Sequence, residues 1–264
     1  MVRVALALVI TSLLAPASAR AFERTRVDTD PDKALFWQFR TVLLHPAYDT
    51  SEDVGPAAVE SALARSITTW NQAAIGCSDL RLVDDGYPTG LTTNLTGGRP
   101  DMDNRIVWRE DDWPAEVSGA TLALTTLVYR RSTGEIEDAD IDLNGFNHTF
   151  TDTDDPALVN TDVENTLTHE LGHLIGLAHV DDPEATMYGL SLPGDLDKRT
   201  LAADDRDGLC WIYPEGRLSP SAPRIPGGNL MGGCAAAPRP SNAAPVGLLS
   251  LALLLLRRRR AARR

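Results

Sequence analysis

Apolar residues recur at three-to-four spacing along parts of the chain, and with the capping signals they predict three helices. The first begins at residue 55 or 56 and runs to residue 74, with Pro56 suited to a first helical turn. The second runs from about residue 162 to residue 176. The third runs over residues 200–213, and Thr200 is its expected N-cap.

Runs of aromatic and β-branched residues predict the strands of a sheet. A turn at residues 132–134 leads into residues 136–143, where apolar residues sit among acids, a pattern typical of a hairpin. The other expected strands are residues 36–44, 79–83, 105–109 and 120–130. The order of helices and strands predicts an α+β fold: one mixed, twisted sheet that carries two long helices, with a C-terminal helix beyond.

The two ends of the chain differ in composition from its middle. Residues 1–19 combine Arg3, an apolar run and the small residues Ala17-Ser18-Ala19, which predicts a secretory signal peptide. A membrane anchor needs about 20 apolar residues, roughly twice the length of this run. We expect a short N-terminal segment at 20–34, one domain at 35–214, a linker rich in Pro, Gly and Ala at 215–245, and a hydrophobic, Arg-rich segment at 246–264.

The expected domain is strongly acidic. Residues 20–214 hold 36 acidic and 15 basic residues, and six of the 25 Lys and Arg residues of the chain are arginines between positions 257 and 264. Because an acidic surface repels nucleic acid and attracts cations, we expect no nucleic-acid partner.

Three cysteines are present, and an exported chain meets an oxidising compartment. Cys77 and Cys210 are candidates for one disulfide, and two buried free thiols are the alternative. On the entropic account such a bridge contributes about 4 to 5 kcal/mol, because it closes a long loop. Cys234 lies beyond the expected domain.

Three histidines and a glutamate lie close together in the string HELGHLIGLAH at residues 169–179. His169 and His173 are four residues apart, so both imidazoles leave one face of the second expected helix and can share a metal. Gly176 can take the left-handed conformation that ends a helix and turns the chain back, which frees His179 to become the third ligand. Three imidazoles suit Zn²⁺ and leave a fourth position for water, as in catalytic sites.

Glu170 follows the first ligand and is the expected general base, because it can accept a proton from water and later pass it to the leaving amine. The pattern HExxH alone can arise by chance on an amphipathic helix with surface histidines. The added Gly176 and His179, together with the expected signal peptide, favour a functional site.

This string resembles the HExxHxxGxxH motif of the metzincin metallopeptidases, and Met187 follows where that clan has its Met-turn. Residues 35–214 look most like the matrixins, the matrix-metalloproteinase type. The resemblance implies a zinc endopeptidase with Met187 as a hydrophobic floor beneath the metal; an ordinary core methionine would pack in nearly the same way. Tyr188, Gly189 and Leu190 are the candidate substrate-pocket residues, in a wall that extends to Pro193.

Three features depart from the matrixin pattern. Val180 follows the third histidine where matrixins have serine, and Tyr188-Gly189 follows the methionine where they have x-Pro. Matrixin zymogens also carry a prodomain cysteine that occupies the open zinc position, whereas no cysteine lies between residues 21 and 76. We therefore expect no cysteine switch; an acidic side chain between Glu23 and Asp32 is an alternative block.

The resemblance further implies structural Ca²⁺ and, in some members, a second zinc. Carboxylates and amides that could bind calcium occur at two places in the chain, although a solvated acidic face is an equal alternative. The candidates are Asp138, Asp140, Asp142 and Asn144, and the loop residues Asp152, Asp154 and Asp155. His148 lacks an evident partner set for a second zinc.

The C-terminal residues resemble a MYXO-CTERM-type sorting tag, with Gly233-Cys234 as the Gly-Cys motif, an apolar run at 246–256 and a terminal arginine cluster. This resemblance implies processing at Cys234 by sorting machinery and display at the cell surface. The alternative is a simple tail anchor in the membrane, held by the arginines on the cytoplasmic side.

Together these features predict an exported zinc endopeptidase, extracellular or attached to the cell surface, that hydrolyses extracellular proteins. The alternative from another class is a non-catalytic, metal-stabilised adhesin or binding module. Glu170 favours the enzyme, because a binding module needs the metal ligands but not the base.

Overall fold

The computed structural model describes residues 22–96, 100–219 and 235–236 of the 264-residue chain. The expected signal peptide, Cys234 and the hydrophobic segment at 246–264 lie outside the described residues. Within the described part, no helix combines the length and the apolar character needed to cross a membrane.

Five strands form one mixed sheet in the order β5–β4–β6–β8–β7. β5, β4, β6 and β8 run parallel to one another. β7 lies at one edge and pairs with β8 in the antiparallel direction. The pairing of β7 with β8 confirms the expected hairpin. The strands are β4 (Thr41–Pro46), β5 (Arg81–Asp84), β6 (Arg105–Trp108), β7 (Ala123–Arg130) and β8 (Glu135–Leu143).

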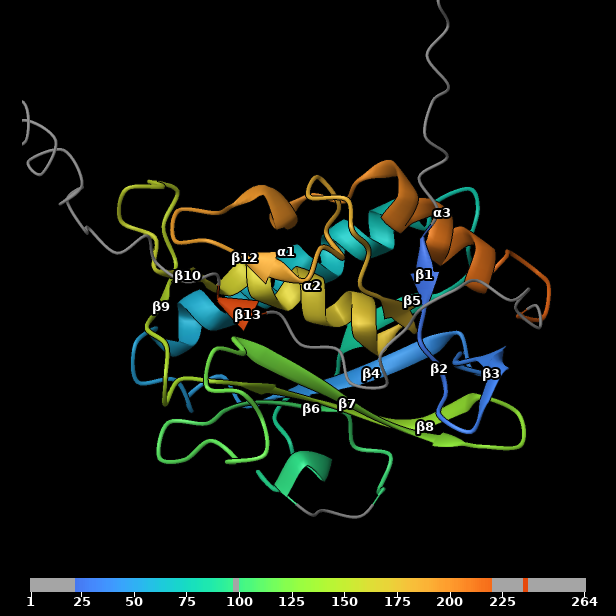
Figure 1. Cartoon of the computed structure of the whole chain (residues 1–264), viewed down its shortest axis with the longest axis horizontal. Helices are drawn as coiled ribbons and strands as arrows, with labels where there is room; N and C mark the ends of the chain where they lie inside the picture. Colours follow the sequence, from blue (N-terminus) through green and yellow to red (C-terminus); the bar gives the residue numbers. More distant parts are fainter. Residues whose placement is uncertain (1–21, 97–99, 220–234, 237–264) are drawn as a thin grey trace, which may run out of the picture.

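Two long helices cover one face of this sheet, and a third lies beyond them (Figure 1). They are α1 (Pro56–Ala73), α2 (Val163–Leu174) and α3 (Ala203–Ile212). Two 3-10 turns, η1 (Asn94–Thr96) and η2 (Asp197–Arg199), complete the helical elements, and η1 lies on the opposite side of the sheet (Figure 1). This arrangement confirms the α+β fold class.

Four pairs of short strands connect these elements at the periphery. β1 (Glu23–Arg24) pairs with β11 (Leu177–Ala178), and β2 (Arg26–Val27) pairs with β3 (Asp30–Ala34). β9 (Phe150–Thr151) pairs with β10 (Thr161–Asp162), directly before α2. β12 (Leu190–Ser191) pairs with β13 (Ala235–Ala236).

Helix α2 runs through the core, and all of its residues are buried. It packs against α1, whose Trp70 indole N–H donates to the carbonyl of Thr168 at 2.9 Å. Leu167, Leu171 and Leu174 belong to the apolar core that α2 shares with the sheet. A helix surrounded in this way cannot shift or rotate without opening cavities, so it is a rigid support for polar side chains.

Strand β8 contains a bulge that explains its irregular pattern of apolar residues. The register with β7 shifts between Val128 and Tyr129, so that Asp138 lies opposite Val128 and Ile136 lies opposite Tyr129. A bulge inserts one residue and reverses the alternation of faces. Core residues therefore stand at Ile136 before the bulge and at Ala139, Ile141 and Leu143 after it.

Two expectations about element bounds are wrong. The expected strand at 36–44 forms only from Thr41, because the aromatic residues before it serve in packing: Trp37 is buried, and its indole N–H donates to the carbonyl of Leu174. Thr200 is not the N-cap of α3, which begins after Ala202. The Asp205 carboxylate instead accepts the Ala202 N–H at 2.9 Å.

Residues outside the expected 35–214 domain pack onto it at both ends. Thr25 donates its N–H to Gly176 and its hydroxyl to Leu177, and Val27 is a core residue. After Tyr213, the N–H of Glu215 donates to the carbonyl of Cys77. The folded body therefore includes residues 22–34 and 215–219 as well.

Candidate metal centre

Three imidazoles converge beside helix α2. His169 and His173 stand one turn apart on α2, and His179 follows β11. The three Nε2 atoms are 3.1 Å apart in every pair. Within the described residues, these histidines form the single group of three or more His, Cys, Asp or Glu side chains that could share a metal.

The hydrogen bonds of the rings fix which nitrogen faces the centre. Nδ1 of His169 lies 2.6 Å from the Thr186 carbonyl oxygen, and Nδ1 of His173 lies 2.9 Å from that of Leu177. Each Nδ1 must carry the hydrogen, since a carbonyl only accepts, so each Nε2 presents a lone pair. Converging lone pairs repel one another unless a cation lies between them.

The donor set fits zinc. Tetrahedral zinc with Zn–N bonds near 2.0 to 2.1 Å separates its nitrogen ligands by roughly 3.3 Å, close to the observed spacing. Burial lowers the pKa of His169 and His173 well below the ordinary value, and it lowers the pKa of His179 to about 4, with Lys198 adding to each shift. The imidazoles are therefore neutral near pH 7, as metal binding requires.

Glu170 is buried beside these ligands and is held by the edge strand of the sheet. The Thr125 hydroxyl on β7 donates to Glu170 Oε2 at 2.6 Å. This contact fixes the carboxylate between α2 and β7. The sequence pattern predicts Glu170 but not Thr125, because the two residues are 45 positions apart.

The turn that carries His179 is built from glycine and from the N-terminal strand. Gly176 has a φ of +94°, as expected for a residue that ends the helix, and a side chain there would meet the Leu35 carbonyl oxygen at 2.8 Å. β1 then pairs with β11 immediately before the third ligand. Residues near position 24 thus support a ligand near position 179.

Met187 packs directly beneath α2. It is buried, and a Cβ added to Gly172 would meet its sulfur at 2.2 Å, so the helix can approach the methionine only through a glycine. Asp205 on α3 holds this turn by accepting the N–H groups of Thr186 at 2.9 Å and Met187 at 3.2 Å. The role of Met187 as a floor beneath a metal stays a prediction.

The candidate pocket residues have different surroundings. Gly189 lies against the third ligand, since an added Cβ would be 2.9 Å from His179 Nδ1. Tyr188 and Leu190 line a cavity of about 420 Å³, and both of their carbonyls accept from the buried Lys198 ammonium. Lys198, which the sequence pattern does not single out, therefore holds residues 188–190, the segment in which Gly189 lies against His179.

A second cavity of about 330 Å³ lies along the first turn of α2. Its lining is mostly polar and uncharged and comes from four separate segments of the chain: Leu122, Asn147, His148, Thr149, Asn160, Thr161, Asp162, Ser191, Leu192 and Pro193. The lining carboxylate, Asp162, is paired with Arg199 at 2.6 Å.

Protein donors engage the calcium candidates. Asp140 accepts the N–H groups of Asn94 and Arg105, so this carboxylate fastens the η1 loop to β8. The others are engaged as follows: Asp138 by Asn94 and Asp101, Asp142 by Arg109 and Thr93, Asp152 by Arg65, Asp154 by Arg199, and Asp155 by Ala157; Asn144 donates to Thr121. His148 lies 2.9 Å from the Gly119 carbonyl.

No carboxylate of the described residues joins the group of three imidazoles, and this includes Glu23 to Asp32. Glu23 lies on β1 opposite Ala178, and burial raises the pKa of its carboxyl group. The structure therefore gives no support to an acidic block of the metal centre.

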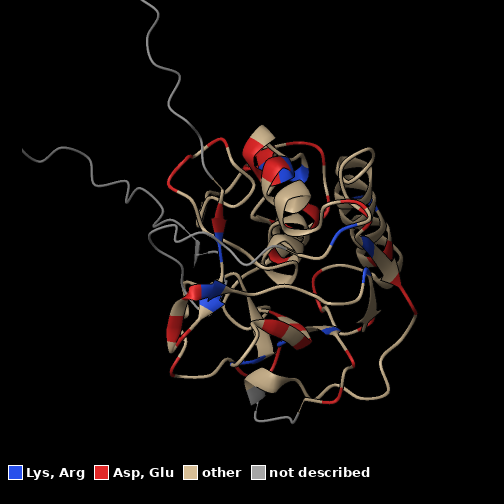
Figure 2. Ribbon diagram, turned by 90° about the vertical axis from the view of Figure 1, so that its right-hand side faces the viewer, with Lys and Arg blue, Asp and Glu red and all other residues tan. Residues whose placement is uncertain are grey.

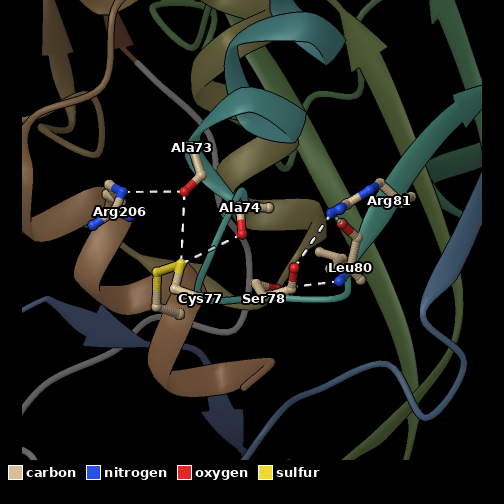
Figure 3. Close-up of a disulfide and its surroundings, with 8 residues drawn as sticks. Ala73, Ala74, Cys77, Ser78, Leu80, Arg81 and Arg206 are labelled. Carbon is tan, nitrogen blue, oxygen red and sulfur yellow. Dashed lines mark hydrogen bonds between the residues drawn. A yellow bond between two sulfur atoms is a disulfide. The ribbon is translucent and has the colours of Figure 1, made fainter. Parts of the chain in front are cut away.

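Cys77 and Cys210 form a disulfide with a Cα–Cα distance of 5.2 Å. Figure 3 shows the bridge between the end of α1 and α3, where Arg206 also donates to the carbonyl of Ala73. The disulfide links the turn after α1 to α3.

Comparison with known proteins agrees with this geometry. Residues 92–214 match the family model of the matrixins. The chain is 43% identical over 61 residues to Metalloendoproteinase 1 of Glycine max, which covers 23% of the chain and 20% of that protein. It is 30% identical over 148 residues to human Matrix metalloproteinase-25, which covers 51% of the chain and 24% of the relative. Human Matrilysin is 44% identical over 46 residues, 17% of each chain.

The fold and the matched segment support a matrixin-like metallopeptidase domain. The aligned parts span a quarter or less of the length of these relatives. The described residues before position 92, including α1 and β1, lie outside the family match but complete the same sheet and the same core.

Proposed function

We propose that the chain is an exported zinc-dependent endopeptidase in which His169, His173 and His179 hold the metal and Glu170 is the general base. The observation that carries this proposal is the convergence of three imidazole Nε2 atoms, 3.1 Å apart in every pair, beside a buried carboxylate. Zinc bound there would supply Lewis acidity toward a water molecule and a peptide carbonyl.

The residues of the chain supply the remaining chemistry. Glu170 accepts a proton from the attacking water and delivers it to the leaving nitrogen, while the Thr125 hydroxyl keeps the carboxylate oriented. β7 is an edge strand and carries Thr125, so an extended peptide can pair with it beside the histidines. These features favour cleavage inside an extended protein segment.

An extracellular or cell-surface location is part of the proposal. The disulfide suits an oxidising compartment, and the sequence of residues 1–19 has the features of a signal peptide. We propose that the C-terminal tag attaches the enzyme to the cell surface after processing at Cys234. Mass spectrometry of the exported protein tests both ends, and an intact Arg264 in the mature protein would contradict processing.

The decisive test compares the zinc-loaded full chain with its Glu170→Gln variant on casein. We expect activity to fall by about 10²- to 10⁴-fold, because general acid–base catalysis is lost. The zinc content and the thermal midpoint should stay unchanged. Glu116→Gln, which replaces an exposed acid, is the matched control and should retain full activity.

One outcome would favour the binding module instead. If the wild-type chain folds and binds one zinc but cleaves no protein substrate under any condition tried, the histidines serve a structural purpose and the endopeptidase proposal fails.

A further inference from the structure

One short segment from the C-terminal part of the chain belongs to the described residues, and it pairs with the strand β12 near the three histidines. Ala235–Ala236 form β13, which runs parallel to β12 with Ala235 opposite Leu190 and Ala236 opposite Ser191. In the view of Figure 1, β13 lies next to β12 and between α2 and β7.

β12 is close to the metal ligands. It begins three residues after Met187, and the preceding Gly189 touches the ring of His179, with 2.9 Å between an added Cβ and Nδ1. Neighbouring strands lie about 4.8 Å apart. β13 therefore lies about one strand spacing from the segment that packs on the third ligand.

The strand β12 also borders both cavities of this region. Ser191 lines the cavity of about 330 Å³, and Leu190 lines the cavity of about 420 Å³. A peptide extended along β12 can therefore direct alternate side chains toward these cavities while its backbone pairs with the strand. β13 uses the backbone positions that such a substrate would need.

We propose that the segment containing Ala235–Ala236 is a tethered competitor that occupies the substrate edge of its own domain; this inference rests on the proposed endopeptidase function. The occupant is the chain's own C-terminal region, joined to the folded body by the 15 residues between Ser219 and Ala235. Exported enzyme that keeps this region is then partly inhibited, and removal of the region releases it.

The expected inhibition is moderate. β13 offers only two residues for pairing. A short tether raises the effective concentration of the segment to the millimolar range, which compensates for weak contacts. A substrate that pairs over more residues should therefore displace it.

The first test measures docking without activity. In the zinc-loaded full chain carrying Glu170→Gln, hydrogen exchange is followed in peptides that cover residues 188–193. Adding Ala235→Pro and Ala236→Pro should accelerate exchange there, because proline lacks the N–H and disrupts a strand. Ala222→Pro, a proline placed elsewhere in the same region, is the matched control and should change nothing. Equal exchange in all three proteins would overturn docking, whether or not the enzyme is active.

The second test measures competition in the active full chain. The double proline variant should show a KM about two- to tenfold lower than the wild type, with kcat unchanged, as expected for removal of a tethered competitor. An unchanged KM would overturn the inhibitory role. So would self-cleavage near position 235 in the wild type but not in Glu170→Gln, because the segment would then be a substrate. If Cys234→Ser alone lowers KM as much, the thiol rather than strand pairing is responsible, and the assignment to β13 fails.

Discussion

Thr125 links the edge of the sheet to the proposed general base through a single hydroxyl. It donates to Glu170 Oε2 at 2.6 Å and favours the charged carboxylate. We predict that Thr125→Val lowers kcat/KM by about tenfold or more, the effect expected for loss of a hydrogen bond to a charged group. Zinc content should not change, since Thr125 does not contact the imidazoles.

A pH profile distinguishes this positioning role from a loss of stability. Without the Thr125 hydrogen bond, the pKa that governs the acidic limb of kcat/KM should rise. Thr126→Val is the matched control, because the Thr126 hydroxyl has no hydrogen-bond partner among the described residues. Identical profiles for Thr125→Val and the wild type would rule out the positioning role.

For single residues, the sequence predicts the three histidines far better than the residues that pack against them. The spacing of His169, His173 and His179 is local, and so is the helix end at Gly176, whose φ of +94° agrees with the expectation. Gly172 and Gly189 have to be glycines because the side chains of Met187 and His179 leave no room for a Cβ. Such approaches depend on the packing of the whole domain and leave no local pattern.

The surroundings of strand β8 also could not be predicted from its local sequence pattern. Its acids alternate with core residues, a pattern that equally suits a solvated face, a calcium site or a buried network. In the structure Asp138, Asp140 and Asp142 are buried against the η1 loop, where backbone and side-chain donors meet them. One strand cannot reveal which loop will cover it.

These buried acids make the stability of the η1 attachment depend on pH. Burial raises the pKa of Asp140 from 3.8 to about 7, and it also raises the pKa of its neighbours Asp138 and Asp142. The folded state therefore binds a proton more tightly than the unfolded state does between about pH 4 and 7. Folding stability contributed by Asp140 is present at the acidic end of this window and is lost as the pH rises.

The measurement is the thermal midpoint of the wild type minus that of Asp140→Asn across this window. We expect this difference to decline as the pH rises, because only the wild type loses the Asp140 proton. Ser132→Ala, which changes no titratable group at an exposed position, should give a constant difference. A constant difference for Asp140→Asn would show that Asp140 titrates with an ordinary pKa.

Helix bounds were predictable where local signals decide them and not where distant residues do. α1 begins at Pro56, as its proline indicates. α3 begins after Ala202 rather than at Thr200, because the Asp205 carboxylate accepts the Ala202 N–H and also the N–H groups of Thr186 and Met187. The same carboxylate thus sets a helix start and holds the turn at Met187.

The disulfide joins parts of the chain that are 133 residues apart. We predict that Cys77→Ser with Cys210→Ser lowers the free energy of unfolding by about 5 kcal/mol on the entropic account. Denaturant unfolding of full chains that also carry Cys234→Ser measures this without a third thiol. A reductant should destabilise the protein that keeps the bridge and leave the double variant unaffected. No effect of reductant on either protein would show that the bridge does not form in solution.

Acidic residues are spread over loops and helices in the view of Figure 2. His169 and His173, in contrast, are buried. The overall charge and the α+β class could be predicted from composition and periodicity. The contribution of residues 22–34 could not, because their partners are the turn at Gly176 and the strand β11 near the other end of the domain.

The pairing of β1 with β11 also sets the order in which the three histidines can be brought together. Thr25 and Leu177 are 152 residues apart, and the Met-turn waits for Asp205 still later in the chain. A growing chain that stops before this point has its histidines but not the contacts that hold the third one. Long-range contacts of this kind slow folding. The contacts that hold His179 and the turn at Met187 are therefore complete only when nearly the whole domain has been made.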